Sequence, residues 1–181
     1  KLYIYSEGKI YDITPIRESQ ALTNPFETTS GSSTVTVTDV AHNAEVGAFV
    51  TFDNGSSTNV VDGIDFNNEF EVLTVPTSNT FTINAETNAS GSTASGGGSV
   101  TAAYQINPGP SASTYGYGWG TLSWSESTWD EPRSSSSVVI AGRSWSLDNF
   151  GEDLIATVLN GGTFIWDTSS GLATRATALS N

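Results

Sequence analysis

Two features of the sequence predict an all-β protein. β-branched and aromatic residues occur in short runs between clusters of Gly, Ser and Asn, which is the pattern of strands and turns. Charged residues make up only 14% of the chain, against roughly 25% in an ordinary globular domain, so long helices rich in Glu, Lys and Arg are not expected. The 181 residues include no cysteine, which excludes disulfides and thiolate metal sites.

The first expected element is a β-hairpin at the start of the chain. Residues 2–5 and 10–14 alternate aliphatic and aromatic side chains, and a short polar turn connects them. Gly8 supplies the positive φ that such a tight turn needs. Pro15 ends the second strand, because it has no N–H to give to a ladder.

Residues 23–105 predict a separate small β module, either a barrel or a sandwich. Thr and Val alternate at residues 34–38 with a period of two, as in a half-buried strand. Further strands are expected at 49–52, 69–75, 80–83 and 100–106. Residues 76–79 predict a polar turn, and the Gly/Ser/Thr-rich residues 88–99 predict a flexible loop.

The C-terminal part predicts another hairpin. Residues 153–158 and 163–166 are apolar runs on either side of an Asn-Gly-Gly turn. A strand is also expected at 138–141, and residues 172–179 fit either a strand or a short helix. Trp145 and Trp166 are expected in the core, on adjacent strands.

An aromatic segment lies between these parts, within the Gly/Ser-rich residues 106–133. The candidate binding residues are Tyr115, Tyr117, Trp119, Trp124 and Trp129. In one interpretation these rings are buried against the chain itself or a neighbouring subunit, because large exposed apolar patches are rare. In the other they form a platform that binds a glycan or a receptor.

Four motifs occur in order along the two ends of the chain: LYIY at 2–5, IYDITP at 10–15, YGYG at 115–118 and WSLDNFGEDLIA at 145–156. Together they resemble virion structural proteins of tailed bacteriophages, of the tail nozzle or tail hub type. The resemblance covers residues 1–22 and 115–179, and it implies a propeller-like antiparallel β scaffold.

The middle of the chain is similar to small β modules inserted in many phage proteins. The similarity is carried by Ala41-His42, Val46-Gly47, Val50, Phe70-Glu71-Val72 and Asn79-Thr80-Phe81-Thr82. Asn43 stands where Gly is common in these modules, and Ala48 stands where Asp is common. Both departures concern the geometry of the turn that precedes the strand at 49–52.

These resemblances imply a domain organisation and a role. The scaffold would comprise residues 1–22 and 134–181, the inserted module residues 23–105, and a loop contacting neighbouring subunits residues 106–133. The implied role is structural: virion assembly and the genome-ejection conduit of a phage tail. Expected partners are further copies in a ring, other tail proteins, and a tail fibre or the host surface. The chain has no Met and opens on Lys1, so we expect a fragment of a longer polypeptide.

The net charge of −13 argues against direct binding to nucleic acid, because neutralising phosphates requires a cationic surface. Anionic membrane surfaces are disfavoured for the same reason. No run approaches the roughly 20 apolar residues of a membrane-spanning helix, so membrane insertion is not expected. A negative conduit does suit DNA that must slide without sticking.

We expect no enzyme, no cofactor and no metal site. His42 is the one histidine, and it falls in a predicted polar turn where nothing buried would orient a general base. Acidic and amide side chains gather at residues 62–69 and 148–153, without the spacing of a calcium loop, so turn capping is expected there. A glycoside hydrolase fragment is a third alternative, but no carboxylate pair is recognisable from the sequence.

Overall fold

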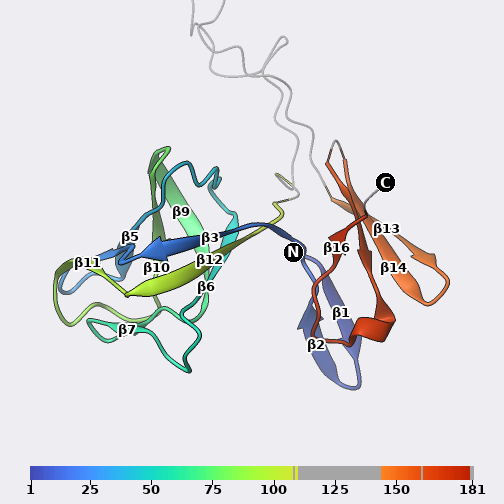
Figure 1. Ribbon diagram of the computed structural model, residues 1–181, viewed down its shortest axis with the longest axis horizontal. Coiled ribbons are helices and arrows are strands. Elements are labelled where there is room, and N and C mark those ends of the chain that lie inside the picture. The colour runs from blue at the N-terminus through green and yellow to red at the C-terminus, as the bar shows by residue number, and fades with distance from the viewer. Residues whose placement is uncertain (108, 110–143, 160, 180–181) are drawn as a thin grey trace, which may run out of the picture.

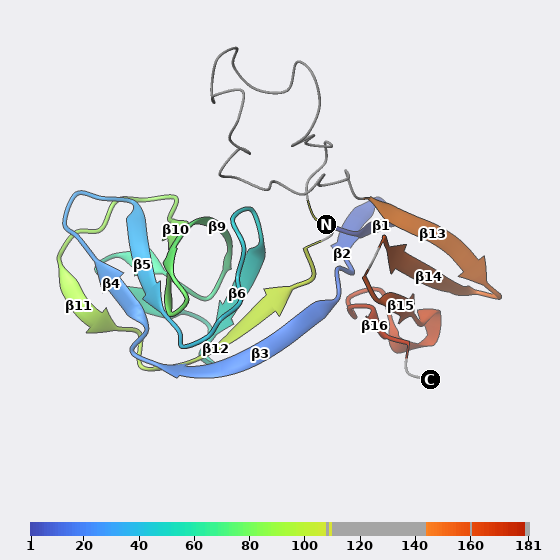
Figure 2. The ribbon, with the colours of Figure 1, turned by 90° about the horizontal axis from the view of Figure 1, so that it is seen from above.

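The computed structural model describes residues 1–107, 109, 144–159 and 161–179. It is all-β, as predicted: antiparallel strands form four sheets, none of which closes, and the described helical structure is one 3-10 turn at Thr168–Ser170. Figures 1 and 2 show two bodies, one built on a large sheet and one on the sheets formed by the two ends of the chain. The predicted strand at 138–141 lies outside the described residues.

The large sheet has eight antiparallel strands in the order β11-β4-β5-β10-β9-β6-β12-β3. Their bounds are β3 (Ile16–Thr23), β4 (Phe26–Thr28), β5 (Thr34–Thr38), β6 (Phe49–Asp53), β9 (Glu69–Thr77), β10 (Thr80–Asn84), β11 (Thr93–Gly96) and β12 (Ser99–Gln105). The predicted strands at 34–38, 49–52, 69–75, 80–83 and 100–106 are thereby confirmed, with small shifts at their ends. Because β9 runs on to Thr77, the turn is shorter than predicted.

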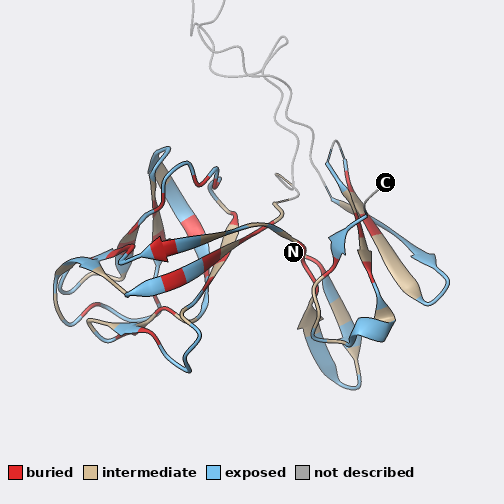
Figure 3. Ribbon diagram, viewed as in Figure 1, coloured by how far each residue is buried: buried red, intermediate tan, exposed pale blue. Residues whose placement is uncertain are grey.

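The core of the large sheet follows from the period-two pattern. Val35 and Val37 of β5 are fully buried, while Thr34 and Thr38 at the two ends of the strand are exposed. Phe26 stacks on Phe66 with ring centroids 3.9 Å apart, and it meets the edge of Phe52 at 5.0 Å. Figure 3 shows the buried positions recurring along these strands. Hydrophobic burial of these rings is the main stabilising contribution of this body.

The two ends of the large sheet meet at one corner. The N–H of Asn24 donates to the carbonyl of Gly98 at 2.7 Å, and the N–H of Gly98 returns a bond to Asn24 Oδ1 at 2.8 Å. Asn24 adopts a φ of 47°, a conformation that Asn tolerates better than most residues. The chain therefore bends from β3 into β4 and from β11 into β12 at the same place.

The prediction of a flexible loop at 88–99 is wrong. Residues Thr93–Gly96 form β11, which pairs with β4, and Ala89 is buried, with backbone bonds to Gly31 and Ser32. The small side chains permit close approach to the core, and the same composition suggested flexibility in the sequence. A further short hairpin, β7 (Val60–Val61) with β8 (Ile64–Asp65), was not predicted.

Strand β3 belongs by its pairing to the large sheet. Residues 1–22 are predicted to belong to the scaffold, but β3 pairs with β12 from Thr23 to Ile16. Leu22 joins the core of the large sheet. The pairing partner of an edge strand is a long-range choice that its own residues do not encode. The division of the chain into domains stays a prediction.

The ends of the chain form two further sheets, called here the terminal sheets. One is the predicted hairpin of β1 (Tyr3–Ser6) and β2 (Lys9–Asp12), with positive φ at Glu7 and Gly8. The other has the order β13 (Trp145–Phe150), β14 (Asp153–Val158), β15 (Thr163–Trp166) and β16 (Thr177–Ala178). The hairpin at 153–166 is confirmed, and the open choice at 172–179 resolves as a short strand.

The expectation that Trp145 and Trp166 lie on adjacent strands is wrong, because β14 lies between β13 and β15. Trp166 is buried, and Trp145 packs its ring edge-on against Phe164 at 5.9 Å. One small apolar cluster joins the first and last parts of the chain: Leu2, Ile13, Ala156, Phe164, Trp166 and Ala176. The N–H of Ala176 also donates to the carbonyl of Ile13 at 3.0 Å.

Candidate functional site at the junction of the two bodies

The five aromatic residues predicted to bind a partner or glycan lie outside the described residues. Tyr115, Tyr117, Trp119, Trp124 and Trp129 therefore remain candidates from the sequence. Among the described residues, the candidate site is the junction. We use this word for the place where β3 and β12 leave the large sheet and meet the terminal sheets.

His42 is buried, and in the described residues its ring nitrogens contact backbone groups. Its Nδ1 accepts a hydrogen bond from the N–H of Ala44 at 2.9 Å, and its Nε2 lies 3.3 Å from the carbonyl of Thr77. In this arrangement Nδ1 is the acceptor, and Nε2 faces a backbone carbonyl to which it can donate. The edge of Phe81 packs against it at 5.0 Å. With both nitrogens bonded to backbone, His42 orders its turn, as the sequence predicted.

The turn around His42 also contains Asn43, and the structure shows its backbone geometry there. Asn43 has a φ of 48° and so adopts the left-handed conformation, which glycine also accepts. Asn accepts this conformation at low cost, and the turn keeps its shape.

The two acidic clusters cap turns. Asp65 Oδ1 accepts the N–H groups of Asn59 at 2.8 Å and Asn67 at 3.0 Å, and these bonds lower the pKa of Asp65. A hydrogen bond from the Thr28 hydroxyl likewise lowers the pKa of Asp62. Asp153 accepts both the N–H and the hydroxyl of Thr168. Among the described residues, no group of three or more His, Asp or Glu side chains is placed to hold a metal ion.

Four charged side chains form a closed ring at the junction. Lys1 Nζ lies 3.2 Å from Asp12 Oδ2 and also contacts Glu69 Oε1. Arg175 completes the ring, at 3.4 Å from Asp12 Oδ1 and 3.8 Å from Glu69 Oε2. Positive and negative groups alternate around this charge ring, so each charge has two opposite neighbours.

The charge ring is partly shielded from water, because the four side chains are between 13% and 29% exposed. Burial alone would lower the pKa of Lys1, but its bonds to Glu69 and Asp12 raise that pKa above the ordinary value. Burial would raise the pKa of Asp12, but hydrogen bonds from Thr14 and the charges of Arg175 and Lys1 lower it. Both groups are therefore held in their charged forms.

Other contacts of these residues cross the same junction. The ammonium of Lys1 lies 4.3 Å from the ring centroid of Phe49 on β6, in cation–π geometry. Gln105, at the end of β12, donates its side-chain amide to Glu69. Arg175 Nη1 donates to the carbonyl of Thr14 at 2.8 Å. The ring is thus tied to the large sheet through β6, β9 and β12.

A buried polar network lies beside the junction in the large sheet. Tyr104 donates its hydroxyl to the carboxylate of Asp39, and both residues are buried. Burial raises the pKa of Asp39, although the Tyr104 hydroxyl lowers it in part. Arg17 lies with its guanidinium 5.5 Å from the Tyr104 ring centroid and donates to the carbonyl of His42 at 2.8 Å.

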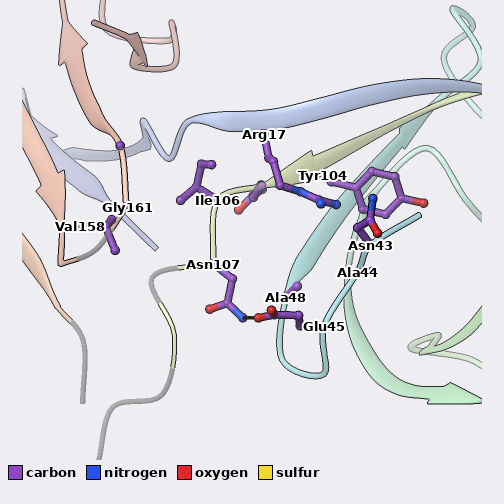
Figure 4. Close-up of a pocket in the computed structure, with 12 residues that line it drawn as sticks. Arg17, Asn43, Ala44, Glu45, Ala48, Tyr104, Ile106, Asn107, Val158 and Gly161 are labelled. Carbon is purple, nitrogen blue, oxygen red and sulfur yellow. Dashed lines mark hydrogen bonds between the residues drawn. The ribbon is translucent and has the colours of Figure 1, made fainter. Parts of the chain in front are cut away.

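A cavity of about 210 Å³ lies next to this network and is lined by residues of both bodies. Figure 4 shows Val158 and Gly161 of the terminal body on one side, with Arg17 and Tyr104 of the large sheet on the other. Asn107 points across to Glu45, and its Nδ2 lies 3.4 Å from Glu45 Oε2. This junction cavity means that the two bodies are not packed tightly on this side.

The charge ring is not visible in the sequence. Its members are separated by up to the whole length of the chain, and no local motif unites them. One usable signal was composition, because Lys and Arg together number six, and Lys1 and Arg175 lie beside or within predicted terminal elements. A scarce cation beside a strand end, in a chain of net charge −13, is a candidate for an ion pair.

Comparison with known proteins assigns the chain to no family. No family model matches the chain, and no curated protein matches it. A solved phage phi92 endosialidase is similar with 22% identity and a TM-score of 0.43, over 51% of this chain and 13% of that chain. The chain thus spans a small part of that protein's length. No described helix is long and apolar enough to cross a membrane.

Proposed function

We propose that this chain is a structural, non-enzymatic part of a bacteriophage tail, in the nozzle or hub, and that it acts in virion assembly and the genome-ejection conduit. The proposal starts from the order of the terminal motifs in the sequence. The observation that carries it is the exposure of large apolar side chains on the terminal sheets.

Large apolar side chains are exposed to solvent on the terminal sheets. Tyr5 and Ile10 sit directly opposite each other on β1 and β2 and are 75% and 71% exposed. Phe150, at the end of β13, is 70% exposed. Contiguous exposed apolar faces are typical of surfaces that bind another protein. A subunit whose terminal sheets pack against neighbouring copies or other tail proteins would bury them.

A reconstruction of the native particle by electron cryomicroscopy tests the proposal. We expect a ring of copies around an axial channel, with the Tyr5 and Ile10 face in contact with a neighbouring subunit. Copies that project singly from the particle with this face in solvent, or a chain found free of particles, would overturn it. Binding of the free monomer to a glycan array, lost on Trp119→Ala, would favour the glycan-binding alternative.

An assembly assay adds a matched pair of variants. Tyr5→Asp should prevent incorporation into particles, because a charge on this face cannot be buried without a partner. Leu73→Asp changes a residue of the large sheet that is 39% exposed, and it should assemble normally. Equal incorporation of both variants would argue against the terminal sheets as the assembly surface.

A further inference from the structure

We propose that the charge ring of Lys1, Asp12, Glu69 and Arg175 is an orientation lock, which fixes the large sheet at one angle to the terminal sheets. This goes beyond the proposed function, because it concerns the geometry of the single chain and holds whether or not the chain assembles.

The distribution of the four charges supports the lock. Three members belong to the terminal body: Asp12 on β2, Lys1 just before β1, and Arg175 just before β16. The fourth, Glu69, begins β9 of the large sheet. Removing the Glu69 charge leaves two cations and one anion facing the large sheet. The side-chain amide of Gln105 on β12 also loses its charged acceptor.

The remaining contacts leave the angle open to change. Within the described residues, the chain crosses the junction between β2 and β3 and again after β12, where the N–H of Ile106 donates to the carbonyl of Pro15 at 2.9 Å. The junction cavity of about 210 Å³ lies beside these crossings, between Arg17 and Gly161, so packing there is incomplete. Relative motion is the ordinary expectation for two bodies with a small interface, unless specific contacts hold them.

The shielding of the ring makes its contacts effective. Side chains that are 13–29% exposed are screened less by salt than fully exposed pairs are. A closed network of charges also orients its members better than an isolated surface pair does. The cation–π contact of Lys1 with Phe49 adds a second link from the same ammonium to the large sheet.

The test is a distance measurement between spin labels on the two bodies. The chain contains no cysteine, so Ser57→Cys in the large body and Glu152→Cys in the β13–β14 turn give two unique labelling sites, both exposed. The labelled parent should give one narrow distance distribution by pulsed electron paramagnetic resonance. Glu69→Gln should widen that distribution at least twofold, because the ring is then open.

Glu71→Gln is the matched control. Glu71 lies two residues along β9 on the same exposed face and is not a member of the ring, so this variant should keep the parent width. Arg175→Gln opens the ring from the terminal side and should also widen the distribution. The distance distribution is measured only on variants whose amide spectrum is as dispersed as that of the parent. If Glu69→Gln does not fold, Arg175→Gln provides the test. A parent-like width in folded Glu69→Gln or Arg175→Gln overturns the lock but leaves the proposed function standing, since that is read on particles.

Discussion

Tyr104 donates its hydroxyl to the Asp39 carboxylate inside the large sheet, where the two residues are 1% and 2% exposed. The pair joins β12 to the segment after β5, 65 residues apart in the chain. A carboxylate removed from water to this extent needs a donor, because an unpaired buried charge is strongly destabilising. The hydroxyl of Tyr104 is therefore a structural requirement of the fold.

Removing that hydroxyl should destabilise the chain measurably. We expect Tyr104→Phe to lower the free energy of unfolding by about 2 kcal/mol, the size typical of a hydrogen bond to a charged group. Urea unfolding followed by far-ultraviolet circular dichroism measures the change, because all five tryptophans lie outside the large sheet. Tyr3→Phe, at a residue that is 52% exposed, should change the free energy by less than about 0.5 kcal/mol. Equal losses in the two variants would contradict the structural role of the pair.

The same pair predicts a loss of stability at alkaline pH. Burial, together with the bond and charge of Asp39, raises the pKa of Tyr104 above that of an ordinary phenol. The contribution of Tyr104 to the free energy of unfolding is constant below the ordinary phenol pKa of about 10. It is lost as pH rises above that value, because the phenol ionises first in the unfolded chain. The free energy of unfolding of the parent should fall more steeply above pH ~10 than that of Tyr104→Phe. Parallel curves would refute this linkage.

Asp12 predicts a loss of stability in acid. Its pKa is lowered in the folded chain, so its contribution is present above its ordinary value and is lost as pH falls below about 4. Asp12→Asn should be less stable than the parent at neutral pH and should approach it in acid. Asp39→Asn is the contrasting variant: the raised pKa of Asp39 predicts that this carboxyl favours the folded state more as pH falls. As pH falls, the free energy of unfolding of Asp12→Asn relative to the parent should rise, and that of Asp39→Asn should fall. Acid titrations in which both relative free energies change in the same direction would contradict these assignments.

Gly97 and Gly98 form a matched pair at the corner of the large sheet. A Cβ at Gly97 would lie 2.5 Å from Phe26 Cδ2, and its φ of +104° is strained for any other residue. Gly98 has a φ of +65°, and a Cβ there would meet nothing within 4 Å. We expect Gly97→Ala to cost about 3 kcal/mol, from both overpacking and strain, and Gly98→Ala to cost about 1 kcal/mol. Thermal unfolding of both variants gives the comparison, and a reversed order would refute it.

The pairing of β3 with β12 predicts which fragment folds. Residues 15–107 include β3 and should give a dispersed amide spectrum when expressed alone. Residues 23–105 lack β3, so the edge of β12 that pairs with β3 in the full chain is left unpaired. This shorter fragment should show weaker dispersion or aggregation, because an uncovered strand of this length is an aggregation-prone edge. Equal dispersion of the two fragments would show that β3 is dispensable.

Much of the fold was determined by local sequence. The alternation of Val and Thr at 34–38 fixes which side of β5 faces the core, and Gly8 allows the tight turn between β1 and β2. The Asp62-Gly63 dipeptide, with φ of 49° and 82°, carried a hairpin signal of the same kind that the prediction overlooked. These features depend on residues near one another in the chain, so a sequence displays them directly.

Tertiary structure alone decided the features that join distant segments. Ala94, Ser95 and Gly96 have little strand preference, and residues 93–96 become β11 because β4 offers an unpaired edge. Asp39 is buried only because Tyr104 reaches it, and the charge ring exists only because β2, β9 and the segment before β16 converge. The physical reason is that ion pairs and strand pairings depend on distance in space, and the fold brings together Lys1, Glu69 and Arg175.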